Sequence, residues 1–437
     1  MPALPLTRRS IFAQAWPIML GQTTVPLVGL VDTAVIGRTG DAAALAGVAL
    51  GTTIINFIFW SFGFLRMGMT GMTAQAAGAG DRAETDALLV RGLAVGLSFG
   101  AVLIALQLAL IPIAFHLLAG GADVDASARP YVAARFLGAP ASLAVFAING
   151  WLLGLGRTRA ALALQIVMNL VNAGLDILFV WHFHWGARGV GLGTACAEWT
   201  ALLVGLALVA PHLHALKDRA SLFDRAKIRR LFAVNADIMI RTVALLLMFG
   251  WFTNAGARMG ATTLAAQQVL MQAVGIVAFV LDGFAFTAES RVGHAIGGGS
   301  RRDLTRAIRL TGEFCLATAA IACVLIALFG RVGIDLLVTD PGVRAQAAAL
   351  LPFVMLLPLI GTPAWLLDGV FIGATAGRAL RNAAILSTVA YIATDLALRP
   401  WGAVGIWIAL TASYVYRAVA LGAFLPGLLA KVAREPA

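Results

Sequence analysis

Residues 11–37 read IFAQAWPIMLGQTTVPLVGLVDTAVIG, and this stretch decides the class of fold. It is apolar over more than the ~20 residues that an α-helix needs to cross the hydrocarbon core of a bilayer. Near its end it nevertheless carries a carboxylate, Asp32. An acid costs about 3 kcal/mol at the centre of a bilayer, so Asp32 must face protein or water, and it becomes the first functional candidate.

Similar apolar runs recur along the whole chain. The 437 residues are 60% hydrophobic and 12% charged, whereas a soluble domain has about 25% charged residues. We therefore expect an all-α polytopic membrane protein in contact with lipid. Hydropathy and the positions of Gly and Pro predict about twelve transmembrane helices. Their expected limits are 12–37, 43–77, 88–118, 131–154, 160–182, 188–210, 228–254, 262–296, 305–338, 345–374, 380–398 and 402–428.

The basic residues predict how these spans are oriented. The formal charge of +11 fits basic loops that face anionic lipid, and we expect no nucleic-acid partner. If the N-terminus lies inside, most Lys and Arg fall in inside segments, while a minority that includes Arg38 and Arg135 falls outside. Both termini are thus predicted to be cytoplasmic, in the inner membrane of a bacterium. We expect a monomer.

The two halves of the chain resemble each other. GRTGDAAALAGVAL, from Gly37, matches ARMGATTLAAQQVL, from Ala257, at a sequence offset of 220 (260 − 40). Three further pairs follow in the same order, from Ala74, Asn149 and Trp185, at offsets of 219 (297 − 78), 219 (369 − 150) and 216 (402 − 186). Parallel repeats around a central cavity are typical of transporters. We expect two pseudo-symmetric six-helix bundles, over 1–210 and 231–437, joined by a polar cytoplasmic linker over 211–230.

A polar stripe lies on the fifth predicted span. Its members recur at helical spacing and share one face, which must face protein or water. They are Gln165, Asn169, Asn172 and Asp176. The residues expected to line a substrate cavity are Gln22, Asn149, Gln165, Asn169 and Glu198. Pro17 and Pro26 weaken the first span, so bending is expected there.

Two acids of the first half predict an ion site. If Asp32 faces Asp176, both carboxylates cannot stay ionised alone, so one takes a proton or both share a cation. Oxygen atoms from Asn172 and Thr194 would also suit Na⁺. The structural alternative is that Asp32 caps backbone or pairs with Arg38.

The second half offers fewer candidates. Asp32 has no acidic counterpart there, because the repeat offset leads to Phe252. Asp282 and Asp368 are minor candidates, and Asp395 is expected near a membrane end. Ion chemistry is therefore predicted to lie in the first half.

The sequence contains no motif that predicts catalysis or a bound cofactor. The three cysteines lie in apolar runs, and the histidines form no metal-binding pattern. His182 and His184 lie between Trp181 and Trp185, which indicates a membrane interface. The GAGD and GGGS segments lack the features of a phosphate loop and are expected to cap helices. Transport would therefore be driven by an H⁺ or Na⁺ gradient, without a metal or a cofactor.

Three segments carry a family resemblance. Residues 16–40, 149–180 and 282–300 read WPIMLGQTTVPLVGLVDTAVIGRTG, NGWLLGLGRTRAALALQIVMNLVNAGLDILFV and DGFAFTAESRVGHAIGGGS. They resemble the multidrug and toxic compound extrusion (MATE) family, in its DinF-like branch. The resemblance covers nearly the whole chain and implies two bundles in a V shape and cation-coupled export of organic compounds. The family's first-lobe cation site carries over onto Asp32, Asn172, Asp176 and Thr194, and a second-lobe acidic site has no clear match.

We therefore predict a secondary active antiporter, not an enzyme. It would export small organic compounds, mainly amphipathic cations, in exchange for H⁺ or Na⁺ by alternating access. A lipid-linked oligosaccharide flippase of related architecture is the first alternative. It would need a cationic central cavity, for which the candidates are Arg66 and Arg241. A membrane-embedded enzyme would need a metal or nucleophile cluster within the bilayer, and the sequence offers none.

Overall fold

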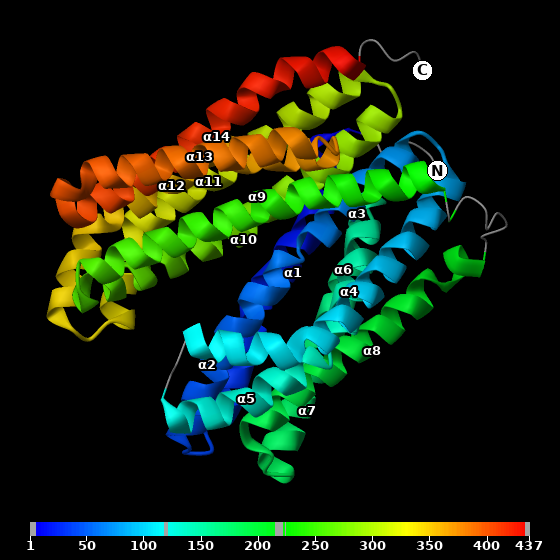
Figure 1. The fold of residues 1–437 in the computed structure, drawn as a ribbon. Helices are drawn as coiled ribbons and strands as arrows, with labels where there is room; N and C mark the ends of the chain where they lie inside the picture. Colours follow the sequence, from blue (N-terminus) through cyan, green and yellow to red (C-terminus); the bar gives the residue numbers. More distant parts are fainter. Residues whose placement is uncertain (1–5, 118–120, 215–221, 223, 433–437) are drawn as a thin grey trace. The chain divides into compact units, whose positions relative to one another are not determined.

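The computed structural model describes residues 6–117, 121–214, 222 and 224–432. Nearly all of these residues are helical, in fourteen α-helices joined by short turns (Figure 1). Several helices begin where the sequence supplies a side-chain cap. Asp41 accepts a hydrogen bond from the backbone N–H of Ala44 at 2.9 Å, and Asp340 accepts one from Val343 at 2.8 Å. Such caps satisfy backbone donors that the first turn of a helix leaves free.

The helices follow the predicted spans. Each span corresponds to one helix or to two consecutive helical segments. In the first half these are α1 (Arg8–Gly37), α2 (Ala42–Ser61) with α3 (Phe64–Gly78), α4 (Arg82–Leu117), α5 (Ala122–Phe136) with α6 (Ala139–Gly154), α7 (Thr158–Ile177) with the π-helical turn η1 (Leu178–His182), and α8 (Gly186–His214). In the second half they are α9 (Arg225–Arg258), α10 (Ala261–Gly297), α11 (Arg301–Leu337), α12 (Pro341–Gly373), α13 (Gly377–Leu398) with the 3₁₀ turn η3 (Arg399–Trp401), and α14 (Gly402–Val432).

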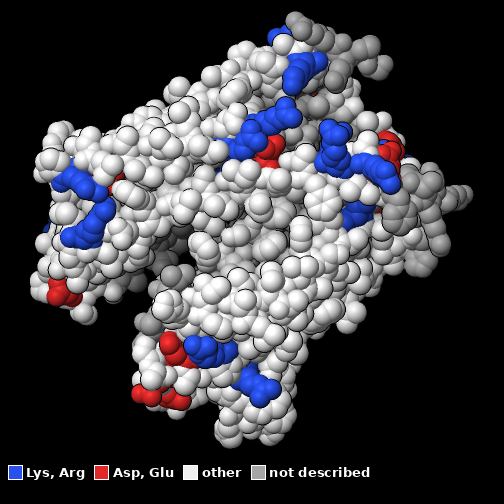
Figure 2. Space-filling view, viewed as in Figure 1, with Lys and Arg blue, Asp and Glu red and all other residues white. Residues whose placement is uncertain are grey.

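Length and hydropathy support twelve membrane crossings in the described chain. Ten segments qualify as spans, and α5 with α6, which are bent by 52° at a short break, add an eleventh. One of the ten, Gly377–Val432, contains both α13 and α14, and these helices pack against each other, so this segment crosses twice. On the face shown in Figure 2, Lys, Arg, Asp and Glu are few and large areas carry no charge, as lipid-facing surface requires.

The chain forms two compact units. The first lobe comprises Thr23–Thr73 and Asp81–Arg230, and the second lobe comprises Met1–Gln22, Ala74–Gly80 and Leu231–Ala437. These limits differ from the predicted bundles, because the N-terminal part of α1 and the end of α3 belong to the second lobe. The predicted linker is also shorter, since α8 continues to His214 and α9 begins at Arg225. Residues 215–221 and 223 of that linker lie outside the described residues.

The repeat seen in the sequence is also a repeat of backbone geometry. Gly80 and Gly299, at an offset of 219 (299 − 80), both have positive φ, at 73° and 65°. Gly186 and Gly402, at an offset of 216 (402 − 186), have φ of 52° and 59°. Only residues without a Cβ adopt this region readily, so the same tight turns are encoded at equivalent places. The two lobes are therefore pseudo-symmetric helical bundles.

Equivalent helices also pack in equivalent pairs. In the first lobe α4 packs on α6, α2 on α5, and α7 on α8. In the second lobe the corresponding contacts join α11 to α12, α10 to α12, and α13 to α14. A continuous α12 thus replaces the bent pair α5 and α6.

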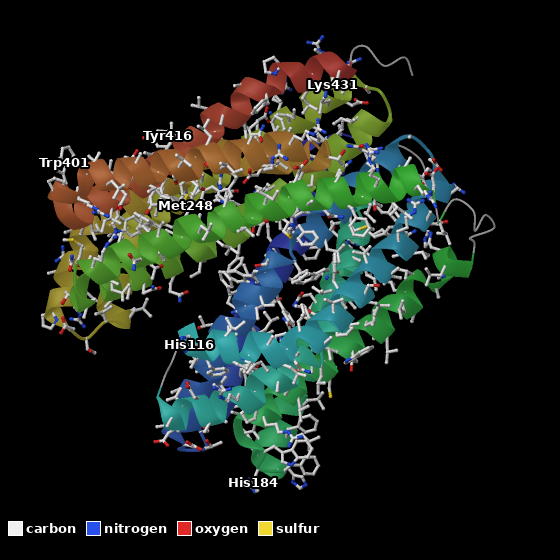
Figure 3. The ribbon with its side chains drawn as sticks, in the orientation of Figure 1. His116, His184, Met248, Trp401, Tyr416 and Lys431 are labelled. Atoms are coloured by element: carbon white, nitrogen blue, oxygen red, sulfur yellow. The ribbon has the colours of Figure 1, made fainter. Side chains whose placement is uncertain are left out.

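Aromatic residues lie at the ends of two hairpins. Figure 3 shows His184 at the tip of the hairpin between α7 and α8, and Trp401 and Lys431 at opposite ends of α14. Beside His184, the rings of Phe183 and Trp185 stack with centroids 5.2 Å apart. Aromatic rings at a hairpin tip are typical of the water–lipid interface.

Candidate functional site

The predicted acid pair is present in the first lobe. α1 carries Asp32 and α7 carries Asp176, and the two residues are 3% and 0% exposed. Their side chains interact directly with each other. The guanidinium of Arg38, the predicted alternative partner, instead lies over the ring of Trp181 at 5.8 Å. Because a carboxylate has no hydrogen to donate, two carboxylates in contact need a shared proton or a shared cation.

Asn172 and Thr194 complete the predicted set. The Asn172 side-chain nitrogen donates to Asp176 Oδ2 at 3.1 Å and to Thr194 Oγ1 at 3.1 Å. Thr194, on α8, donates its own hydrogen to the carbonyl of Val190 at 3.0 Å. One oxygen each of Asp32, Asn172 and Asp176 is buried and accepts no hydrogen bond from the described residues. These oxygen atoms suit either a proton on the acid pair or a small hard cation.

A buried ion pair adjoins this cluster. Arg135 Nη1 on α5 lies 3.0 Å from Glu198 Oε1 on α8, and the two side chains are 9% and 7% exposed. Arg135 is thus buried within α5 and is not an exposed loop charge. The charge of Arg135 also acts on Asp32 and Asp176. Three acids thus lie together with one arginine, which leaves an excess of negative charge that attracts a cation. Arg135 could have been suspected from the sequence, because it lies inside the predicted span 131–154.

Two glycines make room for the acids. A Cβ on Gly193 would collide with Asp176 Oδ1, and a Cβ on Gly138 would collide with Glu198 Oε2. Gly193 lies on α8, which packs against α7, and Gly138 lies in the break between α5 and α6. The absence of a side chain there lets each carboxylate approach the neighbouring backbone closely.

The five predicted cavity residues are divided between the two lobes. On α7, Gln165 donates to Asn169 at 2.8 Å, and Asn169 donates to the carbonyl of Thr24 on α1 at 3.3 Å. Gln165 and Asn169, the first two residues of the polar stripe, therefore face protein, as the periodicity predicts. Asn149 Oδ1 on α6 is buried and accepts no hydrogen bond from the described residues. Gln22 belongs to the second lobe, whereas the other four belong to the first.

The helix-bending prolines both lie within α1. The helix is continuous from Arg8 to Gly37 through Pro17 and Pro26. Pro17 is buried and Pro26 is exposed. Bending at these residues stays a prediction.

In the second lobe the buried acid Asp368 is paired with two arginines. Asp368 on α12 pairs with Arg241 on α9, and its Oδ2 lies 3.7 Å from Arg417 Nε on α14. Arg241, a candidate for a cationic cavity, therefore pairs with a carboxylate that it shares with Arg417. Within the described residues, no three His, Cys, Asp or Glu side chains come together as a metal site would require.

Comparison with known sequences assigns the family. The model of the MatE family matches residues 17–178 and 237–396, which is one match in each half of the chain. The chain is 36% identical to "DNA damage-inducible protein F" of Escherichia coli over 97% of this chain and 93% of that protein. It is 30% identical to "Probable multidrug resistance protein NorM" of Bradyrhizobium diazoefficiens, over 92% and 90% of the two chains.

Solved structures agree with this assignment at the level of the fold. A MOP superfamily transporter from Pyrococcus furiosus has a TM-score of 0.89 at 17% identity and covers 98% of this chain and 97% of its own. The Vibrio cholerae MATE transporter VcmN in its bent form has a TM-score of 0.88 at 17% identity and covers 97% of both chains. The chain therefore belongs to the MatE family of membrane transporters, in its DinF-like branch, and is not an enzyme.

Proposed function

We propose that this transporter exports amphipathic organic cations from the bacterial cytoplasm in exchange for H⁺ or Na⁺. The observation that carries the proposal is the buried contact between Asp32 and Asp176, with Asn172 and Thr194 bonded around it. Relatives that bear the name "multidrug resistance protein" support the class of substrate. An inner-membrane monomer with cytoplasmic termini fits the even number of spans and the basic inside segments.

The exchange follows from the charge of the site. When the site is empty, two adjacent carboxylates repel each other and draw in an ion from the side that is open. One H⁺ or Na⁺ removes this repulsion and lets α1 and α7 approach each other. The site therefore differs in shape between its loaded and unloaded states, and the ion can bias the conformational equilibrium by its differential affinity. Pro17 and Pro26 would let α1 follow this change.

The test is efflux of a fluorescent organic cation from proteoliposomes that contain the purified protein. A pH gradient and a Na⁺ gradient are imposed in separate arms. We expect efflux to rise under one gradient and to stay at the level of protein-free vesicles under the other. If neither gradient changes efflux, ion-coupled export is wrong.

Thr194→Val should weaken ion binding without unfolding the protein. Valine keeps the shape of threonine but removes one oxygen of the site and one partner of Asn172. One hydrogen bond contributes about 1 kcal/mol, so the ion concentration for half-maximal transport should rise about fivefold. Thr200→Val is the matched control, because the Thr200 hydroxyl donates to its own helix, to the carbonyl of Cys196 at 2.8 Å. Equal effects of both variants would show that Thr194 has no part in ion binding.

A further inference from the structure

We propose that Asp395 is the second-lobe counterpart of Asp176, and that Trp251 and Arg258 compensate it permanently, so that only the first lobe exchanges the coupling ion. This inference rests on the proposed ion-coupled export. It assigns the number of coupling sites in the molecule and gives Trp251 and Arg258 a defined role.

The register of α7 and α13 makes Asp395 the residue equivalent to Asp176 in the repeat. α7 begins at Thr158 and α13 begins at Gly377, which is an offset of 219 (377 − 158). The residues just before them have nearly the same backbone, with φ −81° and ψ 53° in the first lobe and φ −86° and ψ 56° in the second. The same offset takes Asp176 to Asp395, which is 2% exposed.

The helix equivalent to α1 presents a hydrogen-bond donor to Asp395. The offset of 219 between the starts of α2 and α10 (261 − 42) takes Asp32 to Trp251, and the offset of 220 between Gly40 and Gly260, which both have positive φ, takes it to Phe252. The indole nitrogen of Trp251 donates to Asp395 Oδ2 at 2.8 Å. The neighbour of Phe252, the counterpart predicted from the sequence, therefore contacts Asp395. The contact between α1 and α7 thus recurs between α9 and α13, with an indole in place of the acid.

A guanidinium adds a second compensation. Arg258 Nη2 lies 3.8 Å from Asp395 Oδ2, and the guanidinium also lies over the ring of Trp251 at 5.5 Å. Both groups belong to α9. Asp395 therefore faces a neutral donor and a positive charge, whereas Asp176 faces another carboxylate.

This difference decides which site can exchange an ion. In the first lobe an added cation relieves repulsion between two acids. In the second lobe an added cation would meet the charge of Arg258 and would have to displace the Trp251 hydrogen bond. Arginine stays charged throughout, so the compensation of Asp395 does not change during transport. The net charge around Asp395 therefore stays constant during transport. The first lobe alone sets the coupling stoichiometry.

The experiment measures coupling stoichiometry in proteoliposomes, from the substrate gradient that a known gradient of the driving ion sustains. Asp176→Asn and Asp395→Asn form a matched pair, since they are the same change at equivalent positions. We expect Asp176→Asn to lose ion-driven accumulation and Asp395→Asn to keep the wild-type stoichiometry. Asparagine at 395 can still accept the Trp251 hydrogen bond, and gel filtration with thermal unfolding checks that each variant is folded.

A gain of function completes the test. Trp251→Asp places a second acid opposite Asp395 and removes the indole donor, so it should raise the number of ions exchanged per substrate. If Asp395→Asn loses coupling as Asp176→Asn does, or if folded Trp251→Asp keeps the wild-type stoichiometry, the inference is wrong. If the wild-type protein does not respond to any ion gradient, the proposed function fails, and this inference fails with it. The wild-type arm thus separates the two failures.

Discussion

Asp32→Asn is expected to reduce ion-driven export to the level of protein-free vesicles while the protein stays folded. Asparagine has nearly the shape of aspartate, but it carries no charge and takes up no proton at neutral pH. The variant leaves Asp176 opposite a neutral amide, which can donate a hydrogen bond to it, so the repulsion that draws in an ion is gone. The measurement is efflux of the fluorescent cation under the gradient that drives the wild-type protein.

A matched control lies in the turn that follows α1. Asp41 caps α2, and asparagine caps helices as well as aspartate does, so Asp41→Asn should transport at the wild-type rate. Uphill transport of the substrate reports ion coupling, whereas passive exchange of the substrate reports substrate binding without coupling. If Asp32→Asn keeps passive exchange of substrate, only the coupling is lost. If Asp32→Asn accumulates substrate as the wild-type protein does, Asp32 has a structural role and the mechanism is wrong.

The arrangement of spans was predictable because its determinants are local. Apolar length fixes where each helix crosses the membrane, and the repeated turn glycines mark equivalent ends in both halves. Gly80 and Gly299 illustrate this, since each lies two residues after a helix end and has positive φ at the predicted offset. The break between α5 and α6 was less visible, because the predicted span 131–154 began in the middle of α5.

The candidate site was only partly predictable. The spacing of Asn172 and Asp176 on one helix already places them on one face, so their contact with each other follows from sequence. Arg135 lies inside the predicted span 131–154, but its pairing with Glu198 could not be predicted, because an arginine near a span end fits an outer loop as well as a buried pair. The α9 residue that contacts Asp395 required the register of α9 to within one residue, because a shift of one residue rotates a side chain by about 100° around a helix.

Replacing Gly193 is expected to have the second large effect. Gly193→Ala should lower ion-driven transport by about tenfold or more, since overpacking costs about 1–3 kcal/mol and 1.4 kcal/mol corresponds to a factor of ten. The new Cβ would collide with Asp176 Oδ1 and would lie 3.2 Å from the Asp176 backbone nitrogen. Because the carboxylate is the more mobile of the two groups, it should rotate away from Asp32 and Asn172, which damages the site more than the fold.

Gly174→Ala supplies the comparison on α7 itself. A Cβ at Gly174 meets nothing within 4 Å, although this residue lies only two positions before Asp176. The substitution should therefore leave transport unchanged and stabilise the helix by up to about 1 kcal/mol. Initial rates of ion-driven efflux and thermal unfolding are measured for both variants. Loss of folding in Gly193→Ala would mean that the backbone contact dominates, and wild-type transport would mean that Asp176 tolerates displacement and does not hold the ion.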